Sequence, residues 1–122
     1  MARTVLTKTT PLGSYPTLPL VANSADVTMT AADVANKNSF AASGNDLIIV
    51  QNTDAVNPYT VTITSIADDY KRTGDITAYT LQAGEIAVLG PFKLPGWQQA
   101  DRSIYLEANN AAIKFGVLTL PG

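Results

Sequence analysis

The stretch Tyr59-Thr60-Val61-Thr62-Ile63-Thr64 alternates apolar or aromatic residues with threonine. Successive side chains on a β-strand point to opposite faces, so the pattern places Tyr59, Val61 and Ile63 in a core and the three threonines on an outer face. β-Branched and aromatic residues are also the ones that strands favour. This stretch therefore predicts a half-buried strand, and it favours a fold built from such strands.

Further β-prone segments follow one another at short intervals. Leu47–Val50 is a continuous aliphatic run, which predicts a strand buried on both faces. Two pairs of segments, 77–82 with 85–89 and 104–108 with 113–118, are separated by short turns that contain glycine or asparagine. Because such turns are typical of hairpins, each pair is predicted to form one.

The region before these strands has a mixed pattern. Residues 26–29 alternate as in a short strand, and Thr30 to Asp33 has the form of a capping box with aspartate in the place of glutamate. A helix of one or two turns is expected there. With 122 residues, the chain predicts a single all-β domain, a β-sandwich or jelly-roll-like barrel with one short helix.

The first 21 residues differ from the rest and are predicted to form an extended N-terminal arm, with residues 22–122 as the β-sandwich body. Pro11, Pro16 and Pro19 exclude a helix or a central strand. The arm is too apolar for an inert linker, so it either packs along its own domain or docks on a neighbouring chain. Its candidate partner-binding residues are Arg3, Leu6, Lys8, Leu12, Tyr15 and Leu18.

The composition excludes several classes of function. The chain has no cysteine and no histidine, which removes disulfides, thiolate nucleophiles, imidazole catalysis and the metal sites that depend on these ligands. A net charge of −2 provides no basic surface for nucleic acid. No run of apolar residues is long enough to span a membrane or to form a secretory signal, so we expect a cytosolic product.

Two long loops carry the candidate contact residues. Residues 67–75 hold Asp68, Asp69 and Asp75, whose spacing fits ion pairing with neighbouring cations better than a calcium site. Residues 90–103 contain the only tryptophan, Trp97, which either closes one end of the sandwich or anchors a partner. If the loops lie at one end of the fold, the contact candidates are Tyr70, Arg72, Trp97 and Arg102.

The order of strands and turns in the second half of the chain is similar to that of a known family. The segments 72–79, 83–85, 90–92, 96–99 and 113–118 read RTGDITAY, AGE, GPF, GWQQ and IKFGVL. In these patterns the chain from about Asn45 to Pro121 resembles the small capsid decoration proteins of tailed bacteriophages, also called cement or head-stabilising proteins. The match over 26–40 is looser.

This resemblance implies a β-rich body, often a trimer, on the outside of an icosahedral shell where subunits of the major capsid protein meet. It implies no enzymatic activity and no cofactor, and virions assembled in the bacterial cytoplasm. It carries no residue motif for the contacts, which therefore rest on side-chain chemistry. Two alternatives stay open: a carbohydrate-binding module that stacks sugars on Trp97 and Tyr70, and a structural component of a phage tail or baseplate.

Overall fold

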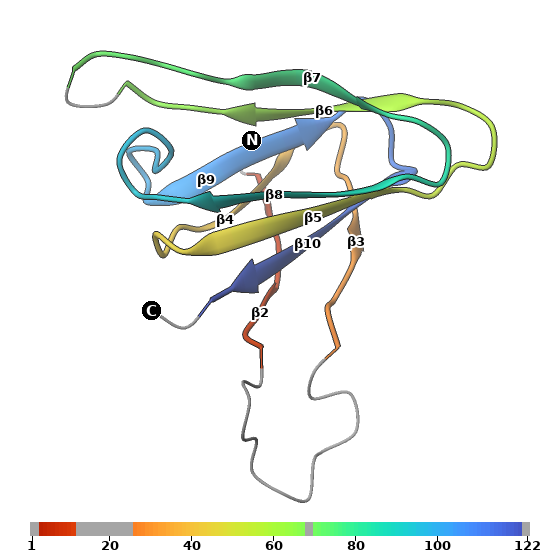
Figure 1. Ribbon diagram of the computed structural model, residues 1–122, viewed down its shortest axis with the longest axis horizontal. Coiled ribbons are helices and arrows are strands. Elements are labelled where there is room, and N and C mark those ends of the chain that lie inside the picture. Colours follow the sequence, from red (N-terminus) through yellow and green to blue (C-terminus); the bar gives the residue numbers. More distant parts are fainter. Residues whose placement is uncertain (1–2, 12–25, 68–69, 121–122) are drawn as a thin grey trace, which may run out of the picture.

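The computed structural model describes residues 3–11, 26–67 and 70–120, and these residues form two β-sheets that pack against each other (Figure 1). The first sheet has the strand order β1 (Thr4–Val5), β4 (Asn38–Ala41), β9 (Ser103–Ala108), β6 (Tyr59–Thr64) and β7 (Ile76–Leu81). The second has the order β2 (Lys8–Thr9), β10 (Ile113–Thr119), β5 (Asp46–Asn52) and β8 (Ile86–Phe92), and β3 (Thr30–Ala31) also pairs with β10. The predicted all-β sandwich is confirmed.

The core lies between the two sheets and is formed by the alternate residues of each strand. In β6 the side chains of Val61 and Ile63 are fully buried and Tyr59 is half-buried, while the three threonines lie on the outer face. The predicted orientation of this strand is confirmed. The other fully buried apolar side chains are those of Phe40, Ile48, Val50, Leu81, Ile104, Leu106, Ile113, Phe115 and Val117.

The two predicted hairpins are wrong. The turn at Gln82–Glu85 has the expected backbone hydrogen bond and Gly84 at φ 78°, but β7 pairs with β6 whereas β8 pairs with β5. Likewise β9 belongs to the first sheet and β10 to the second. Each short turn therefore leads the chain from one sheet to the facing one. The turn chemistry fixes the reversal of the chain, whereas the choice of pairing partner depends on contacts with distant strands.

The predicted short helix is also wrong, because none occurs in the described part of the chain. Thr30–Ala31 is a strand, and the Ala32 N–H donates to the Ile113 carbonyl at 2.8 Å. Asp33 caps a single turn, since its Oδ1 accepts from the Asn36 N–H at 3.0 Å. A helix this short gains little on its own, so pairing with β10 determines the conformation instead.

The segment that precedes Pro11 is part of the sandwich. β1 runs parallel to β4 in the first sheet, and β2 runs parallel to β10 in the second. Leu6 lies between the two strands with 4% of its surface exposed, among the core residues, and its N–H donates to the Ser39 carbonyl at 2.8 Å. Residues 4–9 of the expected arm therefore close one side of the sandwich by joining both sheets.

Candidate functional site

The two long loops meet at one end of the sandwich, which we call the loop end and define as residues 65–75 and 93–102. The Ile66 N–H donates to the Gly96 carbonyl at 2.8 Å. The Gln99 amide nitrogen lies 3.1 Å from the Thr64 carbonyl and 3.3 Å from that of Ser65. Both loops are seen at the left of Figure 1, so the expectation that they share one end of the fold is confirmed.

Asp75 holds the first loop closed at its base. Its Oδ1 accepts from the Ser65 hydroxyl at 2.6 Å and from the Ser65 N–H at 2.8 Å, and these bonds lower the pKa of the Asp75 carboxyl. The Ser65 hydroxyl oxygen also accepts from the Gly74 N–H at 2.9 Å. The two ends of the loop are therefore held together by hydrogen bonds among Ser65, Gly74 and Asp75, which we call the neck of the loop. Asp68 and Asp69 lie outside the described residues.

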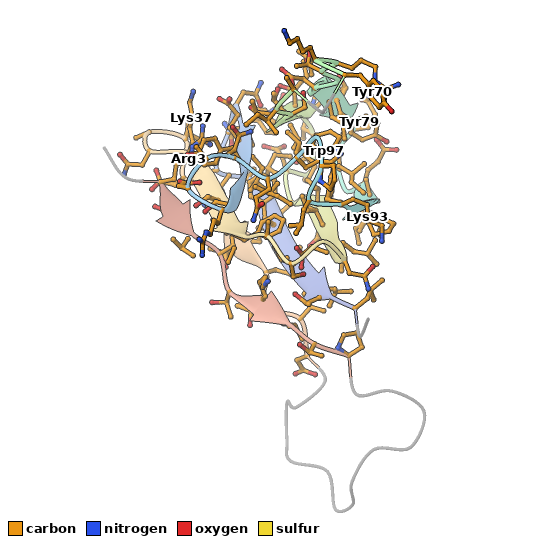
Figure 2. The ribbon with its side chains drawn as sticks, turned by 90° about the vertical axis from the view of Figure 1, so that its left-hand side faces the viewer. Arg3, Lys37, Tyr70, Tyr79, Lys93 and Trp97 are labelled. Carbon is orange, nitrogen blue, oxygen red and sulfur yellow. The ribbon has the colours of Figure 1, made fainter. Side chains whose placement is uncertain are left out.

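Tyr70 and Arg72 are exposed candidate contact residues at the loop end and lie next to each other. Tyr70 is 80% exposed, and the guanidinium carbon of Arg72 lies 5.0 Å from the centre of its ring. A cation over an aromatic face is attracted by the ring quadrupole. The pair therefore forms a polar and aromatic projection on the loop, which can be seen at Tyr70 in Figure 2.

Trp97 closes the end of the core. It is half-buried, packs against the core cluster, and meets the buried Phe92 edge-on, with ring centres 4.8 Å apart and planes at 77°. The backbone around it forms a turn in which the Gln98 N–H donates to the Leu94 carbonyl at 3.0 Å. These contacts are those of a lid over the sandwich. A further contact between Trp97 and a partner stays a prediction.

Arg102 lies at the other side of the loop end. Its carbonyl accepts from the Ala42 N–H at 3.0 Å, directly after β4, and its side chain is exposed. Tyr70 and Arg72 instead follow β6 and precede β7, which lie at the opposite side of the same sheet. The structure thus places Arg102 apart from the Tyr70–Arg72 pair.

The candidates near the N-terminus make contacts within the chain. Arg3 donates to the Asn38 carbonyl at 3.1 Å, and its guanidinium carbon lies 3.9 Å from the centre of the Tyr105 ring. Lys8 donates to the Ala41 carbonyl at 2.8 Å and lies 3.6 Å from the buried carboxylate of Asp46. These contacts and the buried Leu6 fasten the segment to its own domain. Leu12, Tyr15 and Leu18 lie outside the described residues.

The outer face of the first sheet is polar. The Tyr105 hydroxyl donates to Asp101 at 2.8 Å, and this bond lowers the pKa of Asp101 and raises the pKa of Tyr105. Lys37 and Glu107 form an exposed ion pair at 3.4 Å. Figure 2 shows Arg3 and Lys37 on the side of the molecule opposite to Tyr70.

The outer face of β8 and of the adjoining part of β5 is apolar, and its importance was not predicted. Ile86 and Val88 of β8 are 63% and 60% exposed. Val88 is paired with the half-buried Ile49 of β5, and Leu47 on the same face is also half-buried. The strand at 47–50 is therefore fully buried on one face only. The uncharged run from Ile86 to Leu89 was the available signal in the sequence.

The described residues contain neither a cluster of metal ligands nor a helix long enough to cross a membrane. Those residues contain no group of three or more acidic side chains arranged to hold a metal ion. The same part of the chain has no helix that could cross a membrane. No family model, curated protein or solved structure matches the chain.

The carboxylates with lowered pKa values, Asp33, Asp54, Asp75 and Asp101, predict a loss of stability in acid. Their pKa values in the folded state lie below the unfolded value of about 3.9, so their contribution is present above that pH and is lost as the pH falls through the folded pKa. Thermal unfolding measured from about pH 6 to about pH 2.5 should show a falling midpoint in the acid range.

Asp75→Asn removes one of these titrations, so its midpoint should fall less steeply with acid than that of the unmodified protein. Asp26→Asn, at an exposed carboxyl, is the matched control and should follow the unmodified protein. Parallel curves for all three proteins would show that the bonds between Ser65 and Asp75 do not contribute.

Proposed function

We propose that this protein is a structural component of a virion, which decorates the outside of a tailed-phage capsid and stabilises it by bridging subunits of the major capsid protein. In this role it carries out no catalysis and needs no cofactor. It acts after assembly in the cytoplasm of the bacterial host, as a homo-oligomer on the particle surface.

The observation that carries the proposal is the loop end, where an exposed Tyr70–Arg72 pair projects from a loop that is braced at its neck. Tyrosine and arginine are prominent among residues that contribute most to protein interfaces. A loop whose base is already ordered by Ser65 and Asp75 loses less conformational entropy when it binds. These features suit contact with a protein surface.

Three of the five segments that resemble decoration proteins, 72–79, 90–92 and 96–99, lie at this end or directly beside it. Gly74 donates to the Ser65 hydroxyl at the neck of the first loop. Gly90 has φ 114° and lies so close to the Asp46 carbonyl that a side chain there would collide with it, and Gly96 accepts the bond that joins the two loops. Part of the resemblance therefore concerns the same end of the molecule as the loop geometry.

The geometry offers less support for the alternative of a carbohydrate-binding module. Such a module needs an aromatic ring with a free face on which a sugar can stack. The ring of Trp97 is half-buried and packed against Phe92, and one face of Tyr70 is covered by Arg72. A glycan array with the isolated protein tests this alternative.

A decoration protein of this kind stabilises a shell by mass action. When it contacts two or three capsid subunits at once, the first contact raises the effective concentration for the others. Because the bound protein favours the assembled shell over separated subunits, the free energy of binding opposes disassembly.

Binding to purified capsids tests the proposal through the variant Tyr70→Ala/Arg72→Ala. Truncation of two interface residues at about 1 kcal/mol or more each predicts a Kd for capsids at least about thirtyfold higher. The thermal midpoint should change little, because both side chains are exposed. The matched control is Val56→Ala: Val56 is 80% exposed and precedes β6, whereas Tyr70 and Arg72 follow that strand. Equal binding by both variants, measured by co-sedimentation, would remove the loop end as the contact surface.

A further inference from the structure

β8 is an end strand of the second sheet, and no described strand lies on its free side. The direction of its backbone groups follows from the pairing with β5. The Asn52 N–H donates to the Glu85 carbonyl at 2.9 Å, and hydrogen-bonded positions alternate along antiparallel strands. In this register Ala87 and Leu89 bond to β5, so the N–H and C=O groups of Ile86 and Val88 point to the free side.

A second hydrogen bond supports this assignment from the other side of β5. The Thr53 N–H donates to the Ala112 carbonyl at 2.9 Å, in the same register in which β5 pairs with β10. The backbone groups of Gln51 and Ile49 therefore point towards β10 and away from β8. Their partners across the strand pair, Ile86 and Val88, lie at the positions that do not bond to β5.

Residues 86–89 at the free edge of β8 lack the features that normally protect an end strand, whereas the rest of the strand carries Pro91 and a register shift in its pairing with β5 between Leu89 and Phe92. Residues 86–89 contain no charge and no proline, and the side chains of Ile86 and Val88 are mostly exposed. Natural sheets protect their edges with charged residues, prolines or bulges. β7 shows such protection, because its pairing with β6 is interrupted near Ala78, at φ 50°, whose N–H donates to the Thr62 hydroxyl.

We propose that β8 pairs in an antiparallel manner with β8 of a second copy of this chain, so that two sandwiches share one continuous sheet across a two-fold axis. With Ala87 on the axis, Ile86 lies opposite Val88 of the second copy, and Val88 lies opposite its Ile86. Both residues present backbone donors and acceptors to the free side, so the two edges match.

The side chains are as self-complementary as the backbone. A two-fold interface brings the same patch of each copy together, so any charge within it would meet a like charge nearby. The stretch 86–89 has none, and the two apolar pairs across the new strand contact are of a kind that stabilises sheets. The adjoining Ile49 is half-buried on the same face, so the second copy extends an apolar surface that the single chain leaves incomplete.

This inference goes beyond the proposed function and does not depend on it. It also differs from the trimer that the resemblance implies, because a three-fold axis cannot bring β8 against itself. The mass of the oligomer in solution therefore distinguishes the two arrangements.

Sedimentation equilibrium of the full chain tests the proposal. We expect a dimer whose dissociation constant rises at least about tenfold in Val88→Lys, since the change removes the apolar pairs with Ile86 and brings two like charges to diagonal positions across the axis. Val56→Lys makes the same change at a more exposed position and should leave the dimer intact. A monomeric or trimeric unmodified protein, or a dimer unaffected by Val88→Lys, would overturn the proposal.

A cysteine on the axis gives a second test that does not require the lysine variant to fold. The chain has no cysteine of its own, and Ala87 would face its copy at a non-hydrogen-bonded position, where the Cα atoms of a strand pair are about 4.5 Å apart. Under mild oxidation Ala87→Cys should form a disulfide-linked dimer much faster than Val56→Cys. Equal rates would contradict the contact. The contact would also be contradicted if the unmodified protein were a monomer and Val88→Lys weakened its binding to capsids. In that case β8 would pair with a strand of the capsid protein instead of with its own copy.

Discussion

Deletion of residues 1–9 is expected to lower the free energy of unfolding by about 5 kcal/mol or more, as much as the whole stability of a marginal domain. The deletion removes an end strand from each sheet and the buried side chain of Leu6. It also leaves the carboxylate of Asp46, which is fully buried, without Lys8. Loss of one partner of a buried charge is among the more costly changes in proteins.

Two point variants measure how much of the expected loss of stability comes from the packing of the Leu6 side chain alone. Leu6→Ala should cost about 2 to 5 kcal/mol because it leaves a cavity between the sheets. Val5→Ala, one position away but 70% exposed, should cost less than about 0.5 kcal/mol. Urea unfolding measures both. If the deleted protein kept the midpoint of the full chain, residues 4–9 would belong to a separate arm.

Ile63→Ala is expected to cost about 2 to 5 kcal/mol, since Ile63 is fully buried between the sheets. Its neighbour Thr62 lies on the outer face, where its hydroxyl accepts a hydrogen bond from the Ala78 N–H at 3.0 Å. Thr62→Ala should therefore cost only about 0.5 to 1.5 kcal/mol, the usual contribution of one hydrogen bond. Equal or reversed costs in urea unfolding would show that the faces of β6 are wrongly assigned.

The parts of the fold that could be predicted are those fixed by local pattern. The alternation from Tyr59 to Thr64 identified a strand and its buried face, and glycine at position 84 identified a turn. These properties depend on residues that are neighbours in the sequence. The strand partners of β7 to β10 depend instead on contacts between distant segments, so the same turns that suggest hairpins lead the chain between sheets.

The N-terminal segment is a second case in which the sequence predicts the local conformation but not the contact partner. Its prolines and apolar residues correctly predict an extended chain that needs a surface to lie on. Sequence alone could not decide whether that surface belongs to the same chain. The surface that Leu6 contacts lies between the two sheets of its own chain. This surface exists only once both sheets are assembled.

The candidate site could be predicted by residue type but only partly by position. Tyr70 and Arg72 follow from the preference of interfaces for these side chains and from the length of their loop. The separation of Arg102 from them depends on the order of strands in the first sheet. The exposed side chains of β8 could not be foreseen, because an apolar strand has the same sequence pattern whether its outer face is buried or exposed to solvent.

A cryo-electron-microscopy map of the capsid with this protein bound tests the central claim most directly. We predict density for the sandwich on the outer surface of the shell, at points where major capsid subunits meet, with Tyr70 and Arg72 in contact with more than one subunit. Density confined to the tail or baseplate, or a shell surface that stays bare at saturating protein, would contradict the account.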